Sequence, residues 1–202
     1  MTLPDLDRVI HSSLSPVILL EGRREIPPEF ALRARATGRF LAARFPRATF
    51  RSGNATGSDE AFSAGVAEVD PTRLHIVTPS PNHRMRARLA GAVFDSLTDL
   101  SEAQRLLLAE ASIAATPANR GLIRAWLNRP TGPLSAKAAY LVRDTLKVLG
   151  LPGRIPPATA ALFFVDPADP EAGGTGHTIR VCGIAGVPVG FQDHWAEWTH
   201  ES

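Results

Sequence analysis

Two glycine-rich segments of the sequence have residue types that could hold an anion. The first reads SGNATGSDE from Ser52 to Glu60, and the second reads GGTGHTIR from Gly173 to Arg180. Glycine lets backbone amides come close to a ligand, and the helix expected after each turn would add free N–H groups and a positive dipole end. We therefore predict that both turns contact a phosphate-bearing ligand, although glycine is also an ordinary turn residue.

Polar side chains of the first turn could make specific hydrogen bonds to such a ligand. Ser52, Asn54 and Thr56 carry hydroxyl or amide groups, and Asp59 and Glu60 follow them. Asp59 has two interpretations that the sequence leaves open: it caps the next helix, or it accepts a hydrogen bond from a ribose hydroxyl. If the ligand is turned over, Asp59 and Glu60 are also the candidate catalytic carboxylates.

Two arginines follow Gly22, directly after the first apolar run. A guanidinium is planar and always charged, so we expect Arg24 to bind phosphate and one of Arg23 and Arg24 to point to solvent. His83 and Arg84, after the third apolar run, either line the same cleft or begin a solvated helix. The predicted ligand contacts from these motifs are Gly22, Arg24, Ser52, Gly53, Asn54, Gly57, Asp59, Gly173, Gly174, Thr175 and Gly176.

A parallel sheet would bring these turns to one edge. Apolar runs predict strands at residues 16–20, 48–51, 74–80, 158–167 and 187–191, and apolar positions at helical spacing predict helices at 30–45 and after residue 58. Such alternation is typical of an α/β, Rossmann-like fold with a mainly parallel sheet and helices on both faces. In that fold the carboxyl ends of the strands share one edge, where ligands bind.

One domain is expected to span residues 1–202. Its middle, residues 86–149, is predicted to be helical throughout, as an insertion or lid with helices at 101–115, 118–128 and 135–149. In the C-terminal tail, Trp195 and Trp198 are three residues apart and are expected to fold the tail onto the body as a hydrophobic clasp.

Composition limits the classes of function. The chain has 202 residues, a formal net charge of +2 and no dense basic run with interleaved aromatics, so nucleic acid is not an expected partner. The longest apolar run is far shorter than the ~20 residues that span a bilayer, which predicts no membrane partner and a cytoplasmic location. The histidines are dispersed and Cys182 lies in an apolar stretch, so we expect no metal, no cofactor and a buried thiol. Self-association stays open.

Three segments resemble motifs of the SLOG superfamily, Rossmann-like proteins that include the Lonely-guy phosphoribohydrolases and the DNA-processing protein A family. Residues 21–27 (EGRREIP) are similar to the G-x-R turn after the first strand, residues 50–65 to the SGGAxGxD turn and helix, and residues 173–189 to the second glycine turn. The resemblance implies that these turns surround a nucleotide-type ligand. Residues 138–150 also resemble a segment of uncharacterised bacterial and phage-type members, which implies that Arg143 enters the pocket.

Arg180 is a departure from the Lonely-guy enzymes, which carry a glutamate at this point of the second motif. A cation here suits phosphate better than it suits cleavage of an N-glycosidic bond, so hydrolysis of nucleoside monophosphates is not expected. The predicted function is binding, or sensing, of a nucleotide, nucleotide sugar or ADP-ribose-like molecule. An N-glycosidic hydrolase or transferase that uses Asp59 or Glu60 is the alternative, and whether the chain is an enzyme stays open.

Overall fold

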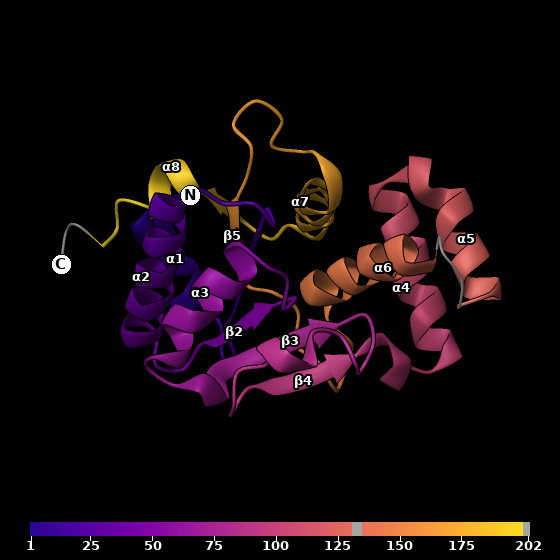
Figure 1. The fold of residues 1–202 in the computed structure, drawn as a ribbon, viewed down its shortest axis with the longest axis horizontal. Helices are drawn as coiled ribbons and strands as arrows, with labels where there is room; N and C mark the ends of the chain where they lie inside the picture. The colour runs from indigo at the N-terminus through magenta and orange to yellow at the C-terminus, as the bar shows by residue number, and fades with distance from the viewer. Residues whose placement is uncertain (131–134, 200–202) are drawn as a thin grey trace.

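The computed structural model describes residues 1–130 and 135–199; residues 131–134, inside the predicted insertion, and residues 200–202 lie outside the described range. At its centre is a parallel six-stranded sheet in the order β4-β3-β2-β1-β5-β6 (Figure 1). The strands are β1 (Val17–Gly22), β2 (Thr49–Ser52), β3 (Leu74–Thr78), β4 (Val93–Ser96), β5 (Ala160–Phe164) and β6 (Val189–Phe191). The predicted Rossmann-like α/β class is confirmed.

Helices cover both faces of the sheet because successive strand residues face opposite sides. Ile18 and Leu20 face one core, whereas Leu19 between them faces the other. The first face is covered by α1 (Leu3–His11), α2 (Pro28–Arg44), α3 (Ser58–Ala67) and α8 (Gln192–Trp195), and the second by α6 (Ser135–Leu149) and α7 (Gly173–Ala185) (Figure 1). Two further helices, α4 (Glu102–Ala115) and α5 (Arg120–Asn128), pack mainly on α6, farther from the sheet. The first glycine turn joins β2 to α3, and the second lies between β5 and α7.

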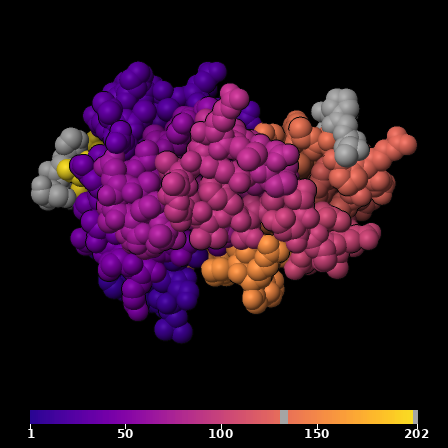
Figure 2. Space-filling model, turned by 60° about the horizontal axis from the view of Figure 1, so that its bottom comes forward, coloured from indigo at the N-terminus to yellow at the C-terminus, as the bar shows by residue number. Residues whose placement is uncertain are grey.

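Residues 86–149 are not helical throughout, which corrects the prediction for the middle of the chain. Residues 93–96 form the edge strand β4, which pairs in parallel with β3. The outer backbone groups of β3 need hydrogen-bond partners, and a four-residue strand is too short for its alternation to stand out in the sequence. Figure 2 shows the β3 and β4 region, in magenta, between the N-terminal helices and the α4 to α6 region. The three predicted helices do form, and Val142 and Leu146 of α6 share a core with Val77 of the sheet.

Both ends of the described chain pack on the first face. Helix α1, which was not predicted, begins with a capping box in which the Thr2 hydroxyl accepts from the Asp5 amide. Near the other end Trp195 is fully buried, and its Nε1 donates to the Phe163 carbonyl at 3.0 Å. Trp198 is 5% exposed, so the predicted clasp of the C-terminal segment is confirmed.

Candidate functional site

A cavity of about 560 Å³ lies at the carboxyl ends of β1 and β5. It is lined by the segments that follow these two strands, by the start of α3 and by one face of α6. The strand order reverses at this point, since β2, β3 and β4 lie on one side of β1 while β5 and β6 lie on the other. In open parallel sheets such a switch point leaves a crevice in which ligands bind. Both predicted glycine turns contribute to this cavity.

About half of the predicted binding residues line the cavity. These are Gly22, Arg24, Asp59, Arg143, Gly173, Gly174 and Thr175. The remaining predicted residues are Ser52, Gly53, Asn54, Gly57, Gly176 and Arg180, and the candidate carboxylate Glu60 is outside the lining as well. The fold therefore brings residues far apart in the sequence to one place, and gives the others different roles.

Three of the residues outside the lining hold the walls together. The Ser52 hydroxyl donates to a backbone carbonyl of β1 at 2.9 Å. Gly57 has a φ of +76°, and a Cβ there would lie 2.3 Å from the Arg24 carbonyl oxygen. A Cβ at Gly176 would lie 1.7 Å from the Glu171 carbonyl oxygen. Glycine is thus required at these points by close backbone packing between loops.

Glu60 is paired at the surface, which removes it from the candidate catalytic groups at the cavity. Its carboxylate accepts from Arg84 Nη2 at 3.2 Å, and the side chain is 54% exposed. Arg84 Nη1 also donates to the Asn54 carbonyl at 3.0 Å. Asn54 has a φ of +55°, a left-handed conformation that Asn tolerates better than most residues other than glycine. Arg84 therefore braces the turn from outside.

Arg180 does not reach the cavity, which corrects the expectation that it serves a phosphate there. Its Nε donates to Thr116 Oγ1 at 3.2 Å, and its Nη1 donates to the Glu171 carbonyl at 3.2 Å. The Arg180 position lies on the side of α7 that packs toward α4, so the guanidinium ties α7 to its neighbours. The charge of Arg180 therefore gives no reason for or against cleavage of an N-glycosidic bond in the cavity.

Asp59 organises the first glycine turn and leaves one oxygen unused. Its Oδ2 accepts from the amides of Gly53, at 3.1 Å, and Ala55, at 3.3 Å. Its Oδ1 is buried and has no hydrogen-bond partner among the described residues. The capping interpretation is therefore right in part: Asp59 binds backbone amides of the preceding turn, and a free carboxylate oxygen is left over.

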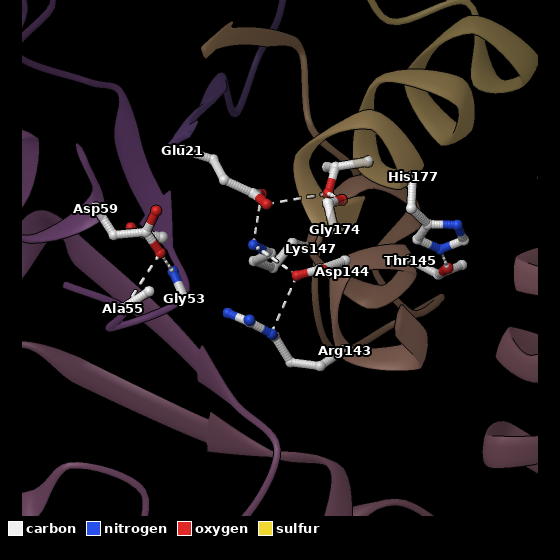
Figure 3. A network of polar contacts seen from close by, with 12 residues as sticks. Glu21, Gly53, Ala55, Asp59, Arg143, Asp144, Thr145, Lys147, Gly174 and His177 are labelled. Carbon is white, nitrogen blue, oxygen red and sulfur yellow. Dashed lines mark hydrogen bonds and ion pairs between the residues drawn. The ribbon is translucent and has the colours of Figure 1, made fainter. Parts of the chain in front are cut away.

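Four charged side chains form a buried network at the cavity: Glu21, Arg143, Asp144 and Lys147 (Figure 3). Lys147 Nζ lies 2.5 Å from Glu21 Oε2 and 2.9 Å from Asp144 Oδ1. Arg143 Nε lies 3.1 Å from Asp144 Oδ1 without hydrogen-bond geometry, and neither Arg143 Nε nor Nη1 has a hydrogen-bond partner within the described ranges. Lys147 is fully buried, and the other three are at most 5% exposed.

Burial raises the pKa of Glu21 to about 7. Lys147 opposes this shift, while the neighbouring charges of Asp144 and Asp59 add to it. Glu21 Oε1 also accepts from the Thr178 hydroxyl of α7 at 3.0 Å. The end of β1 thus carries a carboxyl group that changes its charge near neutral pH.

A second buried network fixes the C-terminal end of α6. Arg51 of β2 donates from Nη1 to the Lys147 carbonyl and from Nη2 to the Pro156 carbonyl, both at 2.8 Å. Its Nε donates to His75 Nδ1 at 3.1 Å, and His75 Nε2 lies 2.8 Å from Asp95 Oδ2. Since the last carbonyls of a helix have no partner within it, Arg51 satisfies one of them and fixes the helix relative to the sheet.

The N-terminus of α7 opens on the cavity. Gly173, Gly174 and Thr175 line it, and no side chain caps the helix. The backbone hydrogen bonds of the helix begin at Gly176, whose amide donates to the Ala172 carbonyl, so the amides before it are not used by the helix. Free amides and the helix dipole make such an end favourable for an anion.

Arg23 and Arg24 both line the cavity, but the charge of Arg23 is neutralised there. Arg23 Nη1 forms an ion pair with Asp166 at 2.7 Å. The Arg24 guanidinium lies over the Tyr140 ring at 5.2 Å from its centroid, and Arg143 lies 5.4 Å from the same centroid. The expectation that one of the two arginines points to solvent is not confirmed, because both line the cavity. Arg24, which is held by a cation–π contact, is the one of the two that has no ion pair among the described residues.

His177 and Cys182 belong to residue types that often react, but both are buried here and have structural roles. His177 is fully buried, and its Nε2 is 3.1 Å from the Leu141 carbonyl, to which it must donate, while Nδ1 is 2.8 Å from Thr116 Oγ1. Burial raises the pKa of Cys182 to about 12, as for an inert core thiol.

No group of side chains suited to a metal ion, and no helix able to cross a membrane, occurs among residues 1–130 and 135–199.

The sequence did not predict three polar residues of the cavity lining, Glu21, Tyr140 and Asp144, nor the buried Lys147 that contacts two of them. The signal was present on α6, where residues 140, 143, 144 and 147 recur at the spacing of one helical face. A polar stripe on a helix usually faces water, so its burial cannot be deduced from the spacing alone.

Comparisons with protein-family models, with curated proteins and with solved structures found no match to this chain.

Proposed function

We propose that this chain binds a phosphate-bearing, nucleotide-type small molecule, such as a nucleotide, a nucleotide sugar or an ADP-ribose-like ligand, in the cavity between β1 and β5. The observation that carries the proposal is the uncapped first turn of α7, which lines the cavity together with Arg24. Unpaired amides and a guanidinium suit a phosphate group. The phosphate is expected to lie beside Gly174.

Size, position and sequence resemblance support the same class of ligand. A volume of about 560 Å³ is within the range of small-molecule pockets, roughly 300–1,000 Å³. The cavity lies at the switch point of the sheet, where doubly wound folds bind nucleotides. The resemblance to the SLOG superfamily, taken as part of the proposal, implies a ligand of this kind that the protein binds or senses.

Valine substitutions at two glycines of α7, one at the cavity and one away from it, test this proposal. A Cβ at Gly174 would meet only Asp144 Oδ2, at 3.5 Å, so Gly174→Val should fold while its methyl groups obstruct the phosphate. Gly183, also on α7, has open space around it and lies away from the cavity, so Gly183→Val is the matched control. Calorimetry with AMP, GMP, CMP, UMP and ADP-ribose should show binding to the wild type and the control, and a loss of about tenfold or more in Gly174→Val.

Failure to bind any of these five compounds, by a protein whose purified form also releases no nucleotide in mass spectrometry, would overturn the proposal. Equal affinity of the wild type and Gly174→Val would show that the second glycine turn is only a turn.

An N-glycosidic hydrolase or transferase is a second candidate, because Asp59 keeps a free carboxylate oxygen at the cavity. A carboxylate stabilises the positive charge that develops on a sugar during cleavage. Incubation with the four monophosphates, with free base followed by chromatography, separates the candidates. Sustained release of base by the wild type that Asp59→Asn abolishes would favour the enzyme, and intact nucleotide would favour binding.

A further inference from the structure

Asp59 and Arg143 bring unpaired polar atoms of opposite character to the cavity. Asp59 is 2% exposed and Arg143 is 4% exposed, and both line the cavity. The unpaired atoms are Asp59 Oδ1, which can only accept a hydrogen bond from a ligand, and Arg143 Nε and Nη1, which can only donate. Buried polar atoms are nearly always satisfied in folded proteins, so these atoms need a partner that the chain does not supply.

The two side chains approach each other across Gly53. A Cβ on Gly53 would lie 1.6 Å from Arg143 Nη1 and 2.9 Å from Asp59 Oδ2. Figure 3 shows the Arg143 guanidinium directed toward Gly53 and Asp59. Although their charges are opposite, Asp59 and Arg143 form no ion pair in the described part of the chain. A donor and an acceptor thus stand next to each other and remain available.

The charged side chains around Asp59 and Arg143 determine which kind of ligand group can bind between them. Three carboxyl groups, from Glu21, Asp59 and Asp144, accompany two cations, Arg143 and Lys147. The guanidinium of Arg143 is therefore already neutralised, and a phosphate placed against it would be repelled by the surrounding carboxylates. At the uncapped end of α7 one carboxylate, that of Asp144, lies near Gly174, but the unpaired amides and Arg24 can offset it, so this end is the better phosphate site. A neutral group that both donates and accepts hydrogen bonds is favoured beside Asp59 and Arg143.

We propose that Asp59 and Arg143 bind the vicinal hydroxyl groups of a ribose, Asp59 Oδ1 accepting from one hydroxyl and Arg143 donating to the other. The proposal rests on the proposed function and narrows it: the ligand is a ribonucleotide-type molecule with free 2′- and 3′-hydroxyls, and a deoxyribose is bound less well. A single adjacent pair of hydroxyls satisfies both orphan groups at once, whereas a phosphate satisfies only the donor.

The test variant is Asp59→Asn, because it changes only the free atom. The amide oxygen of Asn can still accept from the Gly53 and Ala55 amides, while an NH₂ donor replaces the free Oδ1. Glu60→Gln is the matched control, since it makes the same change in the neighbouring residue, which is paired with Arg84 outside the cavity. Circular dichroism and thermal melting check that both variants fold like the wild type.

Calorimetry compares AMP, GMP, CMP and UMP with their 2′-deoxy and 3′-deoxy forms. The wild type and Glu60→Gln should bind the preferred ribonucleotide about tenfold or more tightly than its deoxy forms, the effect of one hydrogen bond to a charged group. Asp59→Asn should lose this preference for at least one deoxy form. Equal affinity of the wild type for ribo and deoxy forms, or an unchanged preference in Asp59→Asn, would overturn the inference while phosphate binding stands. Binding of none of these nucleotides would overturn both.

Discussion

Lys147 offers a direct test of the buried charge network, through the substitution Lys147→Met. Lys147 has no exposed surface, and its Nζ contacts Glu21 Oε2 at 2.5 Å and Asp144 Oδ1 at 2.9 Å. Methionine has a similar length and fills the same space, but it leaves the two carboxyl groups without this cation. We expect a loss of stability that depends on the charge of Glu21, and hence on pH.

The pH dependence follows from the raised pKa of Glu21, about 7 in the folded chain against 4.5 for an unperturbed glutamate. The folded chain holds this proton more tightly than the unfolded chain does, so protonation stabilises fully below about pH 4.5 and is lost as the pH rises through 7. At pH 8 Glu21 is charged, and removal of its cation should cost about 3–5 kcal/mol. At pH 5 Glu21 is neutral, so the ion pair with Asp144 and only a hydrogen bond to an uncharged Glu21 are lost, and the cost should be smaller, about 1.5–3 kcal/mol.

Urea unfolding of the wild type and Lys147→Met at pH 5 and pH 8 measures both losses. The chain has a matched control, because Lys137, its only other lysine, lies exposed on the same helix. Lys137→Met should change the free energy of unfolding by less than about 0.5 kcal/mol at either pH. An equal loss for Lys147→Met at both pH values would refute the assignment of the charge of Glu21, and no loss at pH 8 would refute the network.

Three further outcomes follow from single contacts. Gly53→Ala places a Cβ 1.6 Å from Arg143 Nη1, so the guanidinium must move by about 2 Å to reach an ordinary contact, and calorimetry should show a tenfold or greater loss of ribonucleotide affinity with a small change in melting temperature. Trp195→Ala removes a buried ring and its bond to Phe163, and should lower the free energy of unfolding in urea by about 3–5 kcal/mol. Cys182, with its pKa raised to about 12 by burial, should resist a thiol reagent at pH 8 until the protein is unfolded, and prompt labelling of the native protein would contradict its burial.

The sequence allowed the α/β class and the two glycine turns to be predicted because their signals are local. A buried strand is a short apolar run, and a turn from strand to helix concentrates glycine and capping residues, as at Gly57 and Asp59. The parallel arrangement then places the ends of β1, β2 and β5 at one edge without knowledge of any side-chain contact. Local patterns therefore sufficed for the location of the cavity.

The cavity floor could not be predicted, because it depends on which way a helix faces. Asp144 and Lys147 are typical of a solvated helix surface, yet α6 turns them inward, where Glu21 and Arg143 compensate their charges. The direction in which the Arg180 side chain points could not be predicted from the sequence either. In the sequence it follows the glycine turn, but the 3.6-residue repeat of α7 carries it away from the cavity to Thr116.

The two buried polar networks of the fold differ in a way that separates support from binding. Apolar residues can replace a buried ion pair with little loss of stability or even a gain, so such networks need another reason to persist. Around Arg51 all three guanidinium nitrogens have partners, and the network holds α6 in place. At the cavity Asp59 and Arg143 leave atoms unpaired, at a cost of about 1–3 kcal/mol for each buried group. A ligand that supplies the missing partners recovers this cost, so the unsatisfied network, at the switch point of the sheet, is the one expected to bind it.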